Sequence, residues 1–453
     1  GQVVQHAPAV FKYGKIRGNV MNGKKMGKSV LCAVLVTALL GAGCGKEQSA
    51  PEVYLDESIP ETPVKLFTQN ETVSVAIEEC CRKVLNRDGN TNITLYSDSA
   101  GYYAEEGLSY RELLLKRLSS GTADDLYLIP AEDVLEFDDK GYIYDMSDLK
   151  CVSNLSDDAL IQSTYDGKVF SIPLTYTCFG FVWNVDMLKE YGLEVPENLD
   201  EFLNVCETLK ENGILPYGAN KDFALTVPVM CAGLYDVYQE ADSEKKLEAL
   251  SNGETAISEY MEKGFSFLRL LIDRGYMDPE GALGMAPLSD EEKAFFAEGN
   301  CAFICALYRG VTFEGYPFEI KMTPLPVLEN GSICVVGADQ RLAVNPGSEH
   351  LDAAIAIVEA LGQTETLDSF AASLGKISSS QNATAPDIPQ SDSIIACVAG
   401  GGQIPNQDFR LHFNVWDTVR DLSQQVCRGM SAEEAAAEYD SRQQQEIAVY
   451  GKQ

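Results

Sequence analysis

Histidine is scarce in this chain of 453 residues, and the motifs of several large enzyme classes are missing. The chain has three histidines, of which only His350 and His412 lie beyond the amino-terminal region. It has no H-E-x-x-H pair to hold a catalytic zinc ion, no G-x-S-x-G around a nucleophilic serine and no phosphate-binding loop. We therefore expect no catalytic residue, no metal site and no cofactor, and we interpret both histidines as surface residues.

Basic residues are also few. The chain holds 35 Lys and Arg against 68 Asp and Glu, which gives a formal net charge of -33. Residues 1–43 contain six of the basic residues and no acidic residue, so the remainder is even more acidic. An acidic surface is repelled by nucleic acid and by anionic lipid headgroups. We expect no nucleic-acid partner.

The apolar run Val30–Leu40 is too short to span a bilayer core of about 30 Å. It follows basic residues and precedes small residues, which is the three-part layout of an export signal. The small residues directly before Cys44 resemble the lipobox of bacterial lipoproteins, in which that cysteine is acylated; ordinary cleavage with an incidental Cys44 is the alternative. We predict a signal peptide with upstream residues at 1–43, a lipid-anchored tether at 44–63, and a location at the cell surface or the periplasmic face of a bacterial membrane.

Eleven cysteines follow Cys44, an odd number without the dense spacing of disulfide frameworks or metal sites. A lone cysteine most often behaves as a small buried hydrophobic residue. We therefore predict that most of these cysteines are free thiols, although exported proteins often pair them.

The stretch Ser171–Asp186 reads SIPLTYTCFGFVWNVD and combines two apolar runs with a central group of aromatic and hydroxyl residues. This pattern predicts a strand that breaks into a loop and then resumes. Such a segment suits a chain that crosses between two lobes and leaves side chains in the cleft between them. We interpret it as a hinge and as part of a ligand site.

Strand and helix patterns alternate along the remaining chain. Short apolar runs predict strands at 64–68, 93–96, 125–129 and 301–307. Helix starts are marked by a capping box at Ser109-Tyr-Arg-Glu112 and by similar patterns after Asn198 and Ser289. This alternation predicts an α/β fold of two units, each a mostly parallel sheet flanked by helices.

The succession SIPLTYTCFGFVWNVDMLKEYGLEVPENLDEFLNVCETLKENGILPYGA resembles the extracellular solute-binding proteins of bacterial ABC importers, in particular the maltose-binding-protein-like carbohydrate-binding family 1. The blocks DLYLIPAEDVLEFDDKGYIYDMSDL and FFAEGNCAFICALYRG follow the same family order. The likeness extends from about residue 64 to about residue 445. It departs at Asn198-Leu199, where the family often has Thr-Trp.

This resemblance implies a two-lobed, type II periplasmic-binding-protein-like fold. Lobe 1 would comprise 64–172 and about 338–375, and lobe 2 would comprise 173–337 and about 376–453. It also implies a monomeric receptor that captures a carbohydrate and delivers it to the membrane subunits of an ABC importer by hinge closure. A receptor for another polar solute, or a sensory receptor, is the alternative among binding proteins. A glycan-cleaving enzyme is the alternative of a different class, because its two carboxylates need no local motif.

Sugar binding needs aromatic faces for the apolar faces of a sugar ring and planar polar groups for its hydroxyls. Carried across position by position, the family's loops imply nine ligand contacts in this chain. They are Gln69, Glu132, Tyr176, Phe179, Phe223, Tyr308, Arg309, Asp339 and Trp416. A role in core packing is the alternative for each aromatic residue among them, and Trp416, on a predicted helix, is the clearest case.

Overall fold

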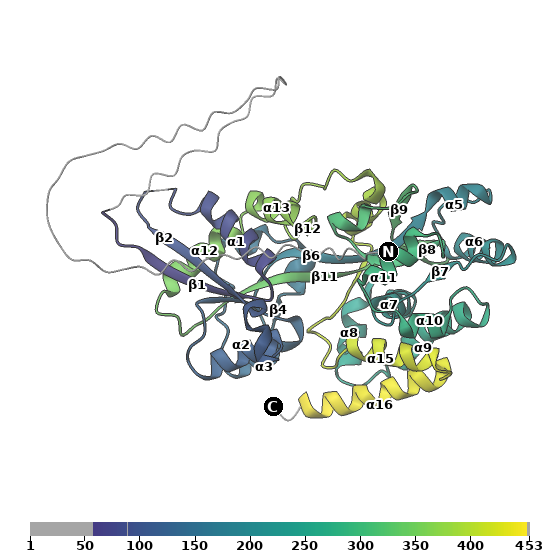
Figure 1. Ribbon diagram of the computed structural model, residues 1–453. Coiled ribbons are helices and arrows are strands. Elements are labelled where there is room, and N and C mark those ends of the chain that lie inside the picture. The colour runs from purple at the N-terminus through teal and green to yellow at the C-terminus, as the bar shows by residue number, and fades with distance from the viewer. Residues whose placement is uncertain (1–57, 88, 451–453) are drawn as a thin grey trace, which may run out of the picture. The chain divides into compact units, whose positions relative to one another are not determined.

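The computed structural model describes residues 58–87 and 89–450 (Figure 1). The predicted signal peptide, Cys44 and most of the predicted tether lie outside these residues. Among the described residues, no helix combines the length and the apolar composition needed to cross a bilayer.

In the described part of the chain, one mixed sheet of eleven strands organises the fold (Figure 1). Its main path has the order β2-β1-β3-β11-β6-β8-β7, and four further strands pair with β6 or β11. The strands on the path are β1 (Thr62–Thr68), β2 (Ile93–Ser99), β3 (Leu126–Leu128), β6 (Ile172–Asn184), β7 (Tyr217–Gly218), β8 (Phe303–Leu307) and β11 (Gly331–Val344). Those off the path are β9 (Ile320–Thr323), β10 (Leu325–Leu328), β12 (Ile377–Ser378) and β13 (Gln403–Pro405), and a separate pair is formed by β4 (Thr164–Tyr165) and β5 (Lys168–Val169).

The two ends of the sheet path are parallel and its centre is antiparallel. Strand β1 pairs in parallel with β2 and β3, and β7 pairs in parallel with β8. Strand β11 is antiparallel to both β3 and β6, and β6 is antiparallel to β8. The prediction of parallel units is therefore correct at both ends, whereas the two long central strands join the units into one continuous sheet.

Strand β6 runs without interruption from Ile172 to Asn184, so the predicted break in this stretch does not occur. Its partners change along its length: β11 and β12 pair with the first half, and β8 and β9 pair with the second. Because these strands supply hydrogen-bond partners to the backbone on both edges, the hydroxyl and aromatic residues remain in extended conformation.

Three helices begin where local capping signals predict. The Ser109 Oγ accepts a hydrogen bond from Glu112 N at 3.3 Å, while Ser109 N donates to Glu112 Oε2 at 2.7 Å. Asn198 and Ser289 cap their helices with the side chain alone, which accepts a hydrogen bond from the backbone N–H of Glu201 at 3.0 Å and of Glu292 at 3.1 Å. The α-helices are α1 (Glu71–Val84), α2 (Tyr110–Ser119), α3 (Val134–Asp139), α4 (Asp157–Ile161), α5 (Val185–Glu190), α6 (Leu199–Glu211), α7 (Phe223–Tyr238), α8 (Ser243–Ser251), α9 (Ser258–Asp273), α10 (Pro279–Gly284), α11 (Asp290–Ala297), α12 (Leu351–Leu361), α13 (Thr364–Ser373), α14 (Asp392–Ala399), α15 (Trp416–Cys427) and α16 (Ala432–Tyr450).

The two faces of β6 serve different hydrophobic clusters. Phe179, Phe181 and Trp183 point into a cluster that also takes side chains from α7, α9 and α15. Cys178 and Val182, which alternate with them, point into a second cluster built on β1, β11, α1 and α12. A third cluster surrounds the aromatic residues of β1, β3 and α3. The alternation of side chains along one strand therefore links two cores.

The cysteines confirm the prediction of free thiols. All eleven that follow Cys44 lie in the described residues and are unpaired, and nine of them are buried. The other two, Cys397 and Cys427, are partly buried.

A close contact between two glycines yields a testable prediction. Gly375, directly after the cap of α13, has φ +61°, and a Cβ there would lie 2.5 Å from Gly310 N. Gly121 holds the same position after α2 with φ +69°, but a Cβ there would meet no atom within 4 Å. We expect Gly121→Ala to lower the free energy of unfolding by about 1 kcal/mol, because alanine disfavours positive φ.

Gly375→Ala should lower the free energy of unfolding by a further 1–3 kcal/mol, roughly, because of overpacking against Gly310. Urea unfolding of both variants measures the difference. Equal losses in the two variants would show that the contact with Gly310 contributes nothing.

Candidate functional site

Two predicted residues follow the carboxyl ends of neighbouring parallel strands. Gln69 comes directly after β1, and Glu132 lies in the short 3-10 helix η2 (Ala131–Asp133) that follows β3. Gln69 is half-buried, and its Oε1 atom has no hydrogen-bond partner among the described residues. The side chain of Glu132 is not described. The strand ends therefore bring these two positions to the edge of the sheet where ligands bind in α/β proteins.

Three predicted aromatic residues come together from segments far apart in the sequence. The Phe179 ring of β6 lies 5.5 Å from the Phe223 ring and 5.2 Å from the Trp416 ring, measured between centroids. Phe223 and Trp416 are the first residues of α7 and α15. Phe179 and Phe223 are each 5% exposed, whereas Trp416 is half-buried. Within this aromatic cluster, Trp416 is the most exposed residue.

The second part of the candidate site is polar. This Asp339 group consists of Asp339 of β11, Thr177 of β6 and Lys376. Its backbone pairs with Thr175 of β6, and its Oδ2 atom accepts a hydrogen bond from Thr177 Oγ1 at 3.0 Å. Lys376, directly before β12, forms an ion pair with the same oxygen. The Asp339 side chain remains 31% exposed. It is thus held in place by two partners and still accessible.

The environment of Asp339 favours its charged form. Burial by itself would raise the pKa of the carboxyl group, but the Lys376 ammonium group and the hydrogen bonds to it outweigh burial and lower the pKa below its ordinary value. Sequence reasoning missed Lys376, which belongs to no motif and reaches Asp339 only through the pairing of β12 with β6.

Several buried polar atoms near the crossing of β6 and β11 have no hydrogen-bond partner among the described residues. They are Thr175 Oγ1, Gln340 Oε1 and Asn406 Oδ1. Gln340 also has a φ of +49°, a left-handed conformation that costs free energy for a residue with a side chain. Leaving a buried polar group unpaired costs about 1–3 kcal/mol. A ligand with several hydroxyl groups, or water, could pair these atoms.

Tyr176 and Tyr308 lie inside the hydrophobic core. Tyr176 is 3% exposed, and its hydroxyl group is hydrogen-bonded to Ser156 Oγ. Tyr308 is 1% exposed and packs against Phe313 with ring centroids 5.4 Å apart. Burial raises the pKa of both hydroxyl groups. Neither ring presents a free face beside Trp416 or Asp339.

Arg309 lines a cavity of about 110 Å³ that also contacts Phe223 of the aromatic cluster. Its Nε atom is buried without a hydrogen-bond partner among the described residues. The same cavity is lined by Glu292, whose carboxylate accepts hydrogen bonds from Asn220 Nδ2 at 2.5 Å and Leu288 N at 2.7 Å. Burial raises the pKa of Glu292. Sequence reasoning took Glu292 only as the partner of a helix cap.

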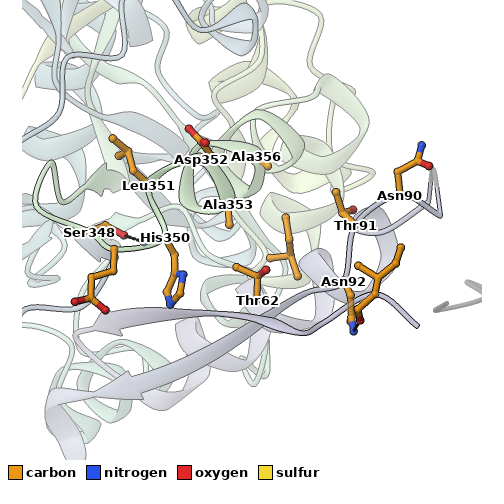
Figure 2. Close-up of a pocket in the computed structure, with 13 residues that line it drawn as sticks. Thr62, Asn90, Thr91, Asn92, Ser348, His350, Leu351, Asp352, Ala353 and Ala356 are labelled. Atoms are coloured by element: carbon orange, nitrogen blue, oxygen red, sulfur yellow. Dashed lines mark hydrogen bonds between the residues drawn. The ribbon is translucent and has the colours of Figure 1, made fainter. Parts of the chain in front are cut away.

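A larger cavity of about 530 Å³ lies elsewhere, between the start of α12 and the residues that lead into β2 (Figure 2). It contains none of the nine predicted residues. His350 lines it, and His350 N donates a hydrogen bond to Ser348 Oγ at 2.9 Å. His350 and His412 are both intermediate in exposure, neither fully buried nor fully exposed.

The described residues contain no cluster of three or more His, Cys, Asp or Glu side chains placed to hold a metal ion. The aromatic cluster and the Asp339 group make up the candidate site. It offers stacking, hydrogen bonds and one held carboxylate.

Comparison with known proteins identifies related chains. A multiple sugar-binding protein of Streptococcus mutans is 22% identical over 359 residues, which is 77% of this chain and 80% of that protein. The melibiose/raffinose/stachyose-binding protein MelE of Bacillus subtilis is 25% identical over 115 residues, or 24% of this chain and 26% of that protein.

The fold has solved counterparts as well. A family 1 extracellular solute-binding protein from Bifidobacterium longum subsp. infantis matches with a TM-score of 0.69 and 17% identity, over 84% of this chain and 98% of that chain. The fold is therefore the mixed α/β fold of two-lobed solute-binding proteins.

A sequence model described as "Bacterial extracellular solute-binding protein" matches residues 109–396, which is more than half of the chain. That family binds solutes and does not catalyse reactions on them. The chain belongs to the family of bacterial extracellular solute-binding proteins.

Proposed function

We propose that this protein captures a carbohydrate outside the cell and delivers it to the membrane subunits of an ABC importer. One observation carries the proposal: the aromatic cluster and the Asp339 group lie on the same face of β6. Phe179 and Thr177 are two residues apart, so their side chains point the same way with about 7 Å between them. A sugar ring stacked on Trp416 therefore has a carboxylate and hydroxyl groups within reach of its own hydroxyls.

The relatives suggest which sugars to test first. The names of the two related proteins refer to multiple sugars and to melibiose, raffinose and stachyose. These three sugars form a series of increasing length, and a short ligand suits a chain with only two tryptophans.

We further propose that ligand binding closes two lobes about the paired strands β6 and β11. Lobe 1 comprises 64–172 and about 338–375, and lobe 2 comprises 173–337 and about 376–453. The packing of α7, α9 and α15 around the aromatic residues of β6 supports the second lobe. A ligand that contacts both lobes shifts the open–closed equilibrium by its difference in affinity for the two forms.

Phe409 is an exception to this division. By residue number it belongs to lobe 2, yet it is 4% exposed and packs in the third cluster with Phe67 and Tyr127 of lobe 1. Under this division, the segment around Phe409 would be one of several contacts between the lobes, because residues such as Leu66 and Ile304 also share the second cluster.

A thermal-shift assay of the protein from Gly45 onward tests the proposal, with melibiose, raffinose and stachyose compared against amino acids and short peptides. A sugar at 100 times its dissociation constant should add about 2.7 kcal/mol to the free energy of unfolding. The sugar should remain intact after hours of incubation. A shift with peptides alone would contradict the carbohydrate proposal, and consumption of the sugar would contradict the assignment as a receptor.

The two tryptophans provide a built-in test of the site. Trp183 is fully buried and donates a hydrogen bond to Thr323 Oγ1 at 2.9 Å, whereas Trp416 is half-buried. We expect a bound sugar to change the fluorescence of the wild type and of Trp183→Phe, and to leave that of Trp416→Phe unchanged.

Trp416→Ala should weaken sugar binding at least about tenfold, which is 1.4 kcal/mol. Calorimetric titration measures this loss, with thermal melting as the check that the variant is folded. Unchanged affinity in a folded Trp416→Ala would show that the indole ring is only part of the core.

Asp339 predicts a specific pH dependence. Because its pKa is lowered in the folded protein, its stabilising contribution is present above the unfolded pKa of about 3.9 and is lost as the pH falls through the folded value. Asp339→Asn removes this contribution. The difference in Tm between wild type and Asp339→Asn should therefore be largest near neutral pH and should shrink towards pH 3.

The exposed residue Asp148 supplies the control, since Asp148→Asn should melt like the wild type across this range. Asp339→Asn should also weaken sugar binding, whereas Asp148→Asn should not. A difference between Asp339→Asn and wild type that does not change with pH would contradict the ion pair with Lys376.

We propose that acylation of Cys44 anchors the protein to the membrane. The full chain, produced in a bacterial host, should sediment with membranes and be released by detergent but not by high salt. Cys44→Ser should abolish incorporation of labelled fatty acid, because the acceptor thiol is gone. Cys32→Ser, within the apolar run, is the matched control and should incorporate label like the wild type. Equal labelling of Cys44→Ser would contradict the anchor.

A further inference from the structure

Two thiols meet where α14 contacts β11. Cys334 Sγ and Cys397 Sγ lie 3.8 Å apart, although 63 positions separate the two residues in the sequence. Cys334 is fully buried on β11, and Cys397 is half-buried on α14. The fold therefore places two sulfur atoms in contact, and one of the two cysteines is partly exposed.

The neighbouring loop holds both thiols in this position. The carbonyl oxygen of Gly402 accepts hydrogen bonds from Cys397 Sγ at 2.8 Å and from Cys334 Sγ at 3.5 Å. Next to Gly402, β13 pairs in parallel with β11, with Gln403 opposite Cys334. Because the loop, the helix and the strand meet at the two sulfur atoms, a short movement of the two side chains would bring the sulfurs to bonding distance. A disulfide bond has a length of about 2.05 Å, so the sulfurs must approach by about 1.8 Å.

We propose that Cys334 and Cys397 form an intramolecular disulfide when the protein meets a small-molecule disulfide oxidant outside the cell. Extracellular surroundings allow disulfides to persist, unlike the reducing cytosol. The proposal depends on the extracellular location of the family, and it does not depend on which solute is bound.

The reaction balances as two thiol–disulfide exchanges. The Cys397 thiol loses its proton, and the thiolate attacks the disulfide of the oxidant, which releases one oxidant thiol and forms a mixed disulfide. The Cys334 thiol then loses its proton and attacks the Cys397 sulfur, which releases the second oxidant thiol. Two protein thiols are oxidised to one disulfide bond, and the oxidant disulfide is reduced to two thiols.

Cys397 makes the first attack because it is the more exposed of the two cysteines. Its hydrogen bond with Cys334 and its burial raise the pKa of the Cys397 thiol, so the reactive thiolate is scarce at neutral pH. Oxidation is therefore expected over hours. A third thiol, Cys178 on β6, contacts Cys334 but is fully buried, so an oxidant cannot reach it first.

The experiment uses the protein from Gly45 onward with oxidised glutathione. After incubation, the remaining thiols are alkylated under denaturing conditions, and the peptides are mapped by mass spectrometry. We expect the loss of two of the eleven free thiols and a linked peptide pair that contains Cys334 and Cys397. Tm should rise by at least about 3 °C, since the bond constrains the unfolded chain, and dithiothreitol should reverse the rise.

Two serine variants separate this pair from a general effect of oxidation. Cys397→Ser should lose both the linked peptides and the rise in Tm. Cys427→Ser, which replaces the other half-buried cysteine, should keep both. Melting without oxidant shows whether each variant folds; if Cys397→Ser does not fold, the peptide map of the wild type decides.

Three results would overturn the proposal. One is a bond that links Cys178 to Cys334. Another is glutathione attached to Cys397 with Cys334 still free. The third is an unchanged count of eleven thiols after oxidation.

Discussion

The pairing of β6 with β11 is the constraint on which the rest of the structure depends. The two strands pair from Ile172 opposite Leu342 to Phe179 opposite Val335, and every other strand of the main sheet path joins them directly or through one or two intervening strands. Because side chains alternate along a strand, a slip of one residue would turn Phe179 out of its cluster and separate Thr177 from Asp339. The register of one strand pair therefore fixes both the hydrophobic cores and the candidate site.

Features that depend on neighbouring residues were predictable from the sequence. The capping box at Ser109, the helix starts after Asn198 and Ser289, and the alternation that defines an α/β fold are all local patterns. The continuous course of β6 was not predictable, because its hydroxyl and aromatic residues resemble a loop until the strands on both edges are known. Lys376 was missed for the same reason, since only long-range pairing brings it to Asp339. Aromatic residues are ambiguous in sequence: Trp416, at the start of α15, is half-buried, whereas Tyr308, directly after β8, is buried.

The candidate site is also where the fold departs from what stability alone would favour. Gln340 adopts a left-handed conformation, and polar atoms of Thr175 and Asn406 are buried with no hydrogen-bond partner in the described part of the chain. Many other side chains of β6 and β11 are apolar and belong to the first two hydrophobic clusters. Such local costs are common where a protein prepares a surface for a ligand, because groups that await a ligand cannot be fully paired without it.

The position of β3 between β1 and β11 has a consequence for the order of folding. Leu128 of β3 pairs with Leu342, about 200 residues later in the chain. The second hydrophobic cluster likewise needs residues from Val64 to Ile394. The amino-terminal strands therefore cannot complete their sheet until most of the polypeptide has been synthesised. Strand pairings between residues far apart in the sequence slow folding, so the chain stays unfolded for longer. A protein that must pass through a membrane channel before it folds gains time from this topology.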